Sequence, residues 1–215
     1  MLIKVCGITN FDNLNSIISD CALNHVIPDY FGFITYKSSL RFVTSLDVRN
    51  LTKILPKNTK QVLVSVNEDL EYLHTYLNLE SFNFIQLHGE EDSRYLSEVK
   101  NRWPGLKIIK AINISTPEDF NNLEGFMDLA DYFLFDAKGV ERGGNGIKFS
   151  WDLLEEYKLK IPYFLSGGIS LEDMDDIKNL AIRDERLVAI DVNSRFEISE
   201  GIKDSQKIVK LLLSW

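Results

Sequence analysis

Short apolar runs recur along the chain at intervals of about 20 to 30 residues, and each is followed by a segment with helical spacing of its apolar positions. The runs predict strands that begin near residues 2, 30, 60, 82, 106, 132, 161 and 187. The intervening segments predict helices over residues 10–24, 45–55, 68–78, 90–101, 117–129, 150–158, 171–180 and 203–213. Eight strand–helix units are typical of an α/β fold of the (β/α)8 TIM-barrel type, with its active site in the loops after the strands. An open, doubly wound sheet is the main alternative.

Several of the predicted helices begin with residues that commonly cap a helix N-terminus. Asn67, Thr116 and Ser170 each precede a first turn that carries acidic residues, and Pro117 directly follows Thr116. Such residues accept hydrogen bonds from the free backbone N–H groups of a first turn, and proline fits its first position. We therefore expect all three to act as caps.

Size and charge narrow the class of protein. A chain of 215 residues that is 45% hydrophobic can bury a large core, which favours one domain over residues 1–215. The net charge of −8 argues against a nucleic-acid partner, because such proteins usually carry a basic excess.

Targeting signals and cysteine spacing narrow the class of protein further. No run approaches the roughly 20 apolar residues of a membrane span, and the first residues do not resemble a secretory signal. We therefore expect no membrane partner and a cytoplasmic location. Cys6 and Cys21 lack metal-ligand spacing, and a reducing compartment predicts that both are free thiols.

Polar residues take one consistent position in the predicted strands. Successive side chains of a strand point to opposite faces, so Lys4 and Cys6 share one face while Ile3 and Val5 share the other. The same parity in later strands predicts a polar group in the barrel interior and at its C-terminal mouth: Lys4, Cys6, Gln86, His88, Asp136, Ser166 and Asp191. A thiol that faces a carboxylic acid across a substrate suggests proton transfer, so this ring is a site hypothesis.

Glycine-rich loops suggest a phosphate site. Gly167 and Gly168 follow the seventh strand, and residues 193–195 follow the eighth, where barrels often bind phosphate on backbone N–H groups. The alternative is that the two glycines only form a tight turn. A further cluster at residues 143–146 lacks both the lysine of a P-loop and GxGxxG spacing, so we interpret it as a lid beside Asp136.

The ordered series of motifs resembles the phosphoribosylanthranilate isomerase family, whose members are (β/α)8 enzymes of tryptophan biosynthesis. Each motif is weak alone, but the series is specific and runs from residue 4 to residue 204. The motifs are KVCGITN (4–10), GFI (32–34), SLRFV (39–43), QLHGE (86–90), LFD (134–136), GGNG (143–146), FSW (149–151), LSGGI (165–169), DVNS (191–194) and GIKD (201–204).

The resemblance implies an Amadori rearrangement of N-(5'-phosphoribosyl)anthranilate to 1-(2-carboxyphenylamino)-1-deoxyribulose 5-phosphate. Asp136 suits a general acid that protonates the ring oxygen, provided that it is held protonated. Cys6 as a thiolate suits a general base that removes the C2 proton. The reaction requires no metal, cofactor or covalent nucleophile, and the expected partner is this small substrate, with the chain a monomer or a homodimer.

The resemblance also assigns substrate-binding residues. Arg41 lies in the loop after the second strand, where a guanidinium can bind the anthranilate carboxylate. Gln86, His88 and Asp191 are substrate-binding candidates; we favour a structural pairing of His88 with Gln86, with a direct proton relay as the alternative. The phosphate-binding candidates are Gly167, Gly168, Asn193, Ser194 and Arg195.

Two features of the sequence depart from the family pattern. Arg195 stands where the family usually has a small residue, and we favour a supplementary contact to phosphate. The loop at residues 35–40 lacks the prolines common there, which loosens the segment that carries Arg41.

A non-catalytic phosphosugar-binding barrel would not need Cys6 and Asp136 together. A barrel such as indole-glycerol-phosphate synthase would need a lysine and glutamate constellation that this chain does not show.

Overall fold

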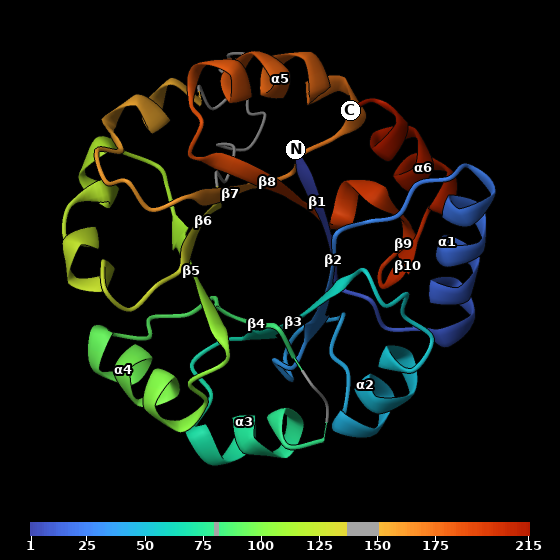
Figure 1. The fold of residues 1–215 in the computed structure, drawn as a ribbon, viewed down its shortest axis with the longest axis horizontal. Coiled ribbons are helices and arrows are strands. Elements are labelled where there is room, and N and C mark those ends of the chain that lie inside the picture. The colour runs from blue at the N-terminus through green and yellow to red at the C-terminus, as the bar shows by residue number, and fades with distance from the viewer. Residues whose placement is uncertain (80–81, 137–150) are drawn as a thin grey trace.

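A closed barrel of eight parallel strands forms the centre of the computed structural model, which describes residues 1–79, 82–136 and 151–215. Each strand pairs with the next along the chain, and the first pairs with the last, so the TIM-barrel prediction is confirmed and an open sheet is excluded (Figure 1). The strands are β1 (Leu2–Cys6), β2 (Tyr30–Ile34), β3 (Lys60–Ser65), β4 (Phe84–Leu87), β5 (Lys107–Asn113), β6 (Tyr132–Asp136), β7 (Tyr163–Ser166) and β8 (Leu187–Val192).

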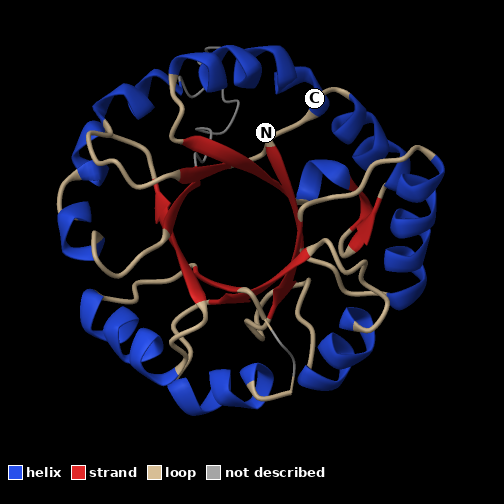
Figure 2. Cartoon of the chain, in the orientation of Figure 1, coloured by secondary structure: helices blue, strands red, loops and turns tan. Residues whose placement is uncertain are grey.

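The helices of the described residues surround the barrel as an outer ring (Figure 2). The α-helices of the described residues are α1 (Phe11–Leu23), α2 (Ser45–Thr52), α3 (Leu70–Leu77), α4 (Ser93–Arg102), α5 (Met174–Arg183) and α6 (Ser205–Leu213). Short 3-10 helices are η1 (Pro117–Phe120), η2 (Leu123–Phe126), η3 (Trp151–Glu156), η4 (Leu171–Asp173) and η5 (Ser194–Phe196). No helix of the described residues is long and apolar enough to cross a membrane.

Two predicted α-helices were wrong in kind. The segment expected as one helix over residues 117–129 forms η1 and η2, because Asn122 between them has a φ of 72°. This left-handed conformation, which asparagine tolerates better than most residues, interrupts a right-handed helix. The segment expected over residues 150–158 forms η3, again a 3-10 helix, in its described part.

The predicted caps had two outcomes. Thr116 and Ser170 each form a capping box with the aspartate three residues later, as predicted. The prediction for Asn67 was wrong, because α3 begins later and Asp69 caps it by accepting a hydrogen bond from the Tyr72 N–H. Asn67 instead accepts a hydrogen bond from the backbone N–H of Glu90, in the loop after β4.

Apolar side chains fill the amino-terminal end of the barrel. Tyr30, Phe84 and Tyr132 are the first residues of their strands, and with Phe164 they form edge-to-face and tilted contacts at ring-centroid distances of 5.3 to 5.9 Å. Such contacts stabilise a core beyond the area they bury. The aromatic plug closes this end, so the opposite, carboxyl-terminal rim remains for a site.

A short hairpin that the sequence did not predict lies between β8 and α6. Its strands are β9 (Glu197–Ser199) and β10 (Ile202–Lys203), and it sits beside α1 in Figure 1. The Asn13 side chain of α1 exchanges two hydrogen bonds with the Lys203 backbone, at 2.9 and 2.8 Å. Phe196 just before the hairpin is fully buried in the core between sheet and helices. The hairpin is therefore fixed to the barrel.

Candidate active site

The predicted polar ring lies inside the barrel at the carboxyl-terminal ends of the strands. Alternate apolar residues, such as Ile3 and Val5, belong to the core that faces the helices, whereas Cys6 belongs to the inner cluster. The strand register sets Lys4 level with Asp191, and Asp136 level with Ser166. The prediction that these polar side chains point into the barrel is therefore confirmed.

Cys6 and Lys4 share one confined space at the end of β1. Only 4% of Cys6 is exposed and Lys4 is fully buried. Gly32 of β2 faces them, and a Cβ atom there would lie 2.9 Å from Cys6 Sγ and 3.2 Å from Lys4 Nζ. The absent side chain of Gly32 is thus what leaves room for the thiol and the ammonium together. Lys4 Nζ also donates a hydrogen bond to Asp191 Oδ2 at 2.9 Å.

The ammonium groups near Cys6 oppose the effect of its burial, whereas the Asp191 carboxylate adds to it. Burial raises the pKa of the Cys6 thiol, and the Lys4 and Lys203 ammonium groups act in the opposite direction. Burial also disfavours the charge on Lys4, but Asp191 and Cys6 outweigh this and raise the pKa of Lys4. Lys4 therefore stays protonated beside the thiol.

Two buried oxygens in this region point to a polar ligand. Asp191 Oδ1 and Gln86 Oε1 have no hydrogen-bond partner among the described residues. Burial of an unpaired acceptor costs about 1–3 kcal/mol, so a hydroxyl group that donates to such an oxygen would be favourable. Both atoms lie on inward-facing residues of the ring.

Asp136 lies in a more open part of the rim, next to His88. His88 Nε2 is 3.4 Å from Asp136 Oδ2, and the two side chains are 27% and 17% exposed. Gln86 Nε2 is 2.8 Å from His88 Nδ1. When the Gln86 amide donates to Nδ1, the neutral ring carries its proton on Nε2, which faces Asp136. The predicted pairing of Gln86 with His88 is therefore present, while the role of His88 stays a prediction.

A buried ion pair supports the loop that carries His88. Lys110 Nζ donates to the Gly89 carbonyl at 2.6 Å and contacts Glu91 Oε2 at 2.9 Å. Glu91 Oε2 also accepts from the Gly89 N–H at 2.9 Å. The backbone after His88 is thus held from both sides. Sequence reasoning missed this pair because β5 reads as an apolar run that Lys110 merely interrupts.

Arg41 is engaged by a carboxylate that the sequence analysis did not single out. Its Nε and Nη2 donate to Glu197 Oε1 and Oε2 at 2.8 and 2.6 Å. Lys203 Nζ donates to Glu197 Oε1 and to Asn193 Oδ1, both at 2.6 Å. We call these four residues, Arg41, Asn193, Glu197 and Lys203, the rim network. The GIKD motif could have drawn attention to Lys203. No local feature of the sequence indicates that Glu197 contacts Arg41.

The rim network is packed on the loop that follows Cys6. Gly7 has a φ of 77°, and a Cβ atom there would lie 2.7 Å from Arg41 Cδ and 2.9 Å from Asn193 Oδ1. Burial disfavours the charge on Glu197, but hydrogen bonds from Arg41 and Lys203 outweigh this and lower the pKa of Glu197. The hydrogen bond to Glu197 in turn raises the pKa of Arg41. The pair is therefore ionised.

The predicted phosphate residues lie at the ends of β7 and β8. Gly167 and Gly168 have φ values of 106° and 71°, so this turn requires glycine whether or not it binds a ligand. Among the described residues, no hydrogen bond engages the backbone N–H groups of Gly168 or Ser194. The Arg195 side chain is exposed. The glycine cluster at residues 143–146 lies outside the described residues.

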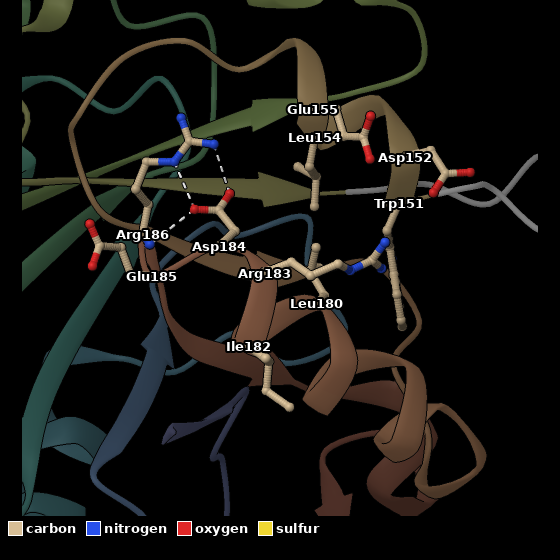
Figure 3. Close-up of a pocket in the computed structure, with 10 residues that line it drawn as sticks. All are labelled: Trp151, Asp152, Leu154, Glu155, Leu180, Ile182, Arg183, Asp184, Glu185 and Arg186. Carbon is tan, nitrogen blue, oxygen red and sulfur yellow. Dashed lines mark hydrogen bonds and ion pairs between the residues drawn. The ribbon is translucent and has the colours of Figure 1, made fainter.

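A separate pocket lies away from the rim, between η3 and α5 (Figure 3). Asp184 and Arg186, which line it, precede β8 and so belong to the amino-terminal side of the sheet. They pair with each other at 2.7 and 2.8 Å, as the dashed lines show. None of the predicted site residues lines this pocket. Within the part of the chain that the structure describes, no cluster of three or more His, Cys, Asp or Glu residues could hold a metal ion.

Comparison with known proteins gives a consistent result. The family model of N-(5'-phosphoribosyl)anthranilate isomerase matches residues 3–213. The N-(5'-phosphoribosyl)anthranilate isomerase of Parabacteroides distasonis is 36% identical over 209 residues, which cover 97% of this chain and 90% of the relative. The fold of this chain is similar to that of the Thermotoga maritima phosphoribosyl anthranilate isomerase, with a TM-score of 0.77, 29% identity, and coverage of 99% of this chain and 97% of that one. A phosphoribosyl anthranilate isomerase in complex with reduced 1-(o-carboxyphenylamino)-1-deoxyribulose 5-phosphate is 27% identical, with a TM-score of 0.76 and 100% and 97% coverage.

Proposed function

The chain belongs to the N-(5'-phosphoribosyl)anthranilate isomerase family and is an enzyme, and from this premise we propose the chemistry of its rim. Its reaction is the Amadori rearrangement of N-(5'-phosphoribosyl)anthranilate to 1-(2-carboxyphenylamino)-1-deoxyribulose 5-phosphate, a step of tryptophan biosynthesis. Asp136 is the general acid and Cys6 is the general base. The observation that carries these roles is that both side chains face inward at the same open rim of the barrel.

The first step opens the furanose ring. Asp136 donates its proton to the ring oxygen while the anthranilate nitrogen supplies the electron pair that breaks the C1–O bond. The products are the free C4 hydroxyl, a protonated Schiff base at C1 and the Asp136 carboxylate. His88 beside Asp136 orients the carboxyl group through Nε2, and Gln86 holds His88 from the other side.

The second step moves hydrogen from C2. The iminium group acidifies the C2–H bond, and the Cys6 thiolate takes this proton, which leaves an enolamine and a neutral thiol. Lys4 stabilises the thiolate by charge, since its ammonium lies in the same confined space against Gly32. Tautomerisation to the ketone adds a proton at C1 and removes the proton of the C2 hydroxyl. The Cys6 thiol supplies the first and the Asp136 carboxylate takes up the second, directly or through water, so both groups regain their starting protonation states.

Binding groups surround this centre. Asp191 Oδ1, a buried acceptor that no described residue engages, takes a hydroxyl of the sugar chain. Arg41 takes the anthranilate carboxylate. The phosphate lies on the backbone N–H groups of Gly168 and Ser194, where Gly167 and Asn193 complete the two loops and Arg195 adds a charge from outside.

The test is a fluorescence assay that follows the consumption of freshly generated phosphoribosylanthranilate by the purified protein. We expect turnover without added metal or cofactor. Saturable binding of the reduced product analogue with no turnover of the substrate would instead support a phosphosugar-binding barrel and would contradict the proposed reaction.

A further inference from the structure

The rim network connects the two ends of the proposed ligand site. Arg41 is the proposed carboxylate ligand, and Asn193 belongs to the proposed phosphate loop. Glu197 accepts hydrogen bonds from Arg41, Lys203 donates one to Asn193, and Lys203 also donates to Glu197, all at distances of 2.6 to 2.8 Å. Glu197 has 5% of its side chain exposed and Lys203 is fully buried, so this is a built interior cluster and not a surface ion pair.

The edge of the Arg41 guanidinium that Glu197 occupies determines which N–H donors remain free to bind a ligand. Glu197 uses the edge of the guanidinium formed by Nε and Nη2. Nη1 makes no hydrogen bond with any described residue, and 17% of the Arg41 side chain is exposed. A guanidinium has five N–H donors, so the edge formed by Nη1 and the second N–H of Nη2 can still bind a carboxylate with two hydrogen bonds.

The surroundings fix this orientation. The Arg41 stem crosses Gly7, where a Cβ atom would come within 2.7 Å of Cδ, and Lys203 holds Glu197 from the far side. Lys203 also offsets the charge that Glu197 would otherwise present to an anionic ligand. The three charges sum to one net positive charge, which favours an anion at the free edge of Arg41.

We propose that Glu197, supported by Lys203, is a positioning residue that turns the free edge of the Arg41 guanidinium toward the aryl carboxylate of the substrate. The inference rests on the proposed function, because it assumes that Arg41 binds this carboxylate. It predicts that Glu197 affects recognition of the carboxylate and not the chemical step. A positioned donor pair loses less conformational entropy on binding than a free arginine side chain does.

The experiment compares two ligands on the same variants. One is the reduced product analogue, 1-(2-carboxyphenylamino)-1-deoxyribulose 5-phosphate in reduced form, and the other is its counterpart made from aniline, which lacks the carboxylate. For Glu197→Gln and for the shorter Glu197→Asp, we expect affinity for the carboxylated ligand to fall about tenfold or more. Affinity for the aniline counterpart should change less than about twofold, and KM should rise with kcat nearly constant.

Controls separate positioning from charge and from folding. Glu200→Gln removes the same charge from the same hairpin, and Glu200 acts on Arg41 through charge alone, so this variant should bind both ligands as the wild type does. In an Arg41→Ala background, Glu197→Gln should cause no further loss of the carboxylated ligand. Because each variant serves as its own reference for the two ligands, partial unfolding cannot imitate the selective loss.

Two results would overturn the proposal. Equal loss of both ligands would make Glu197 a purely structural residue, and tighter binding of the carboxylated ligand by Glu197→Gln would make Glu197 a competitor for Arg41. Failure of the proposed function is a different result, since the wild-type protein would then leave phosphoribosylanthranilate unchanged.

Discussion

The two proposed proton-transfer groups occupy opposite kinds of surroundings within one rim. The side formed by β1, β2, β8 and the hairpin buries Cys6 near the cations Lys4 and Lys203 and the carboxylate of Asp191. The side formed by β4 and β6 holds Asp136 beside His88, with both side chains partly exposed. We call them the thiol side and the carboxyl side.

The difference follows from what each proposed role requires. A buried thiol ionises only where positive charge compensates for the lost solvation, so a base on Cys6 needs nearby ammonium groups. A general acid must be able to regain a proton, and partial exposure with a histidine neighbour provides routes for it. The two roles therefore depend on different neighbours, and substitutions on the two sides should differ in their effects on kcat and on its pH dependence.

The largest expected effect is on the thiol side. Cys6→Ala should lower kcat by up to about 10⁴-fold, because alanine cannot accept the C2 proton. The affinity for the reduced product analogue should stay nearly unchanged, since the thiol acts on the reacting atom. The fluorescence assay and calorimetry measure the two quantities. Cys21→Ala, which removes the buried thiol of α1, is the control and should retain activity. Near-normal turnover by Cys6→Ala would remove Cys6 from the mechanism.

A smaller loss is expected on the carboxyl side. Asp136→Asn keeps the shape of the side chain but cannot donate a carboxylic proton, so kcat should fall by about 10² or more. His88 at 3.4 Å can take over part of the proton delivery, which is why we expect the loss to be smaller than for Cys6→Ala. A kcat equal to that of the wild type would assign the acid role to another group.

The pH dependence of kcat/KM tests whether Lys4 promotes ionisation of Cys6. Burial raises the pKa of Cys6 and Lys4 lowers it, so the thiolate fraction and kcat/KM should rise with pH. Lys4→Met removes the lowering charge, which moves this rise to higher pH and reduces activity at neutral pH. The rate of Cys6 alkylation by iodoacetamide against pH measures the thiol directly.

A double variant checks the sign of this effect. Asp191 raises the pKa of Cys6, so Lys4→Met combined with Asp191→Asn should return the alkylation profile part of the way toward that of the wild type. An alkylation profile that Lys4→Met leaves in place would show that Lys4 serves only the ion pair with Asp191.

The smallest effect is expected outside both sides, at Arg195. Its exposed side chain next to the proposed phosphate loop suggests a supplementary contact, worth less than about fivefold in affinity. Arg195→Ala should weaken inhibition by inorganic phosphate and raise KM, more so at low salt, with kcat almost unchanged. Phosphate inhibition measured across ionic strengths tests this. Identical values for both proteins would leave the backbone N–H groups as the whole phosphate site.

Local rules of the chain predicted much of the fold. Parity within a strand depends only on the alternation of side chains, so the inward positions of Lys4, Cys6 and Asp136 followed directly from the apolar pattern. The interruption at Asn122 did not, because one left-handed residue can divide a segment that still has helical spacing. The boundary error at Asn67 arose because Asn67 and Asp69, two positions apart, are both residue types that can cap a helix.

The sequence by itself determined the eight strand–helix units and the shared face of the polar residues, because hydrophobic periodicity and strand parity act over a few neighbouring positions. Only the tertiary structure decided which charges meet. Arg41 and Glu197 are 156 positions apart, and Lys4 and Asp191 are 187 apart, yet each pair is in direct contact. Barrel closure brings β8 next to β1 and sets the hairpin against the loop after β2, and no local pattern records that proximity.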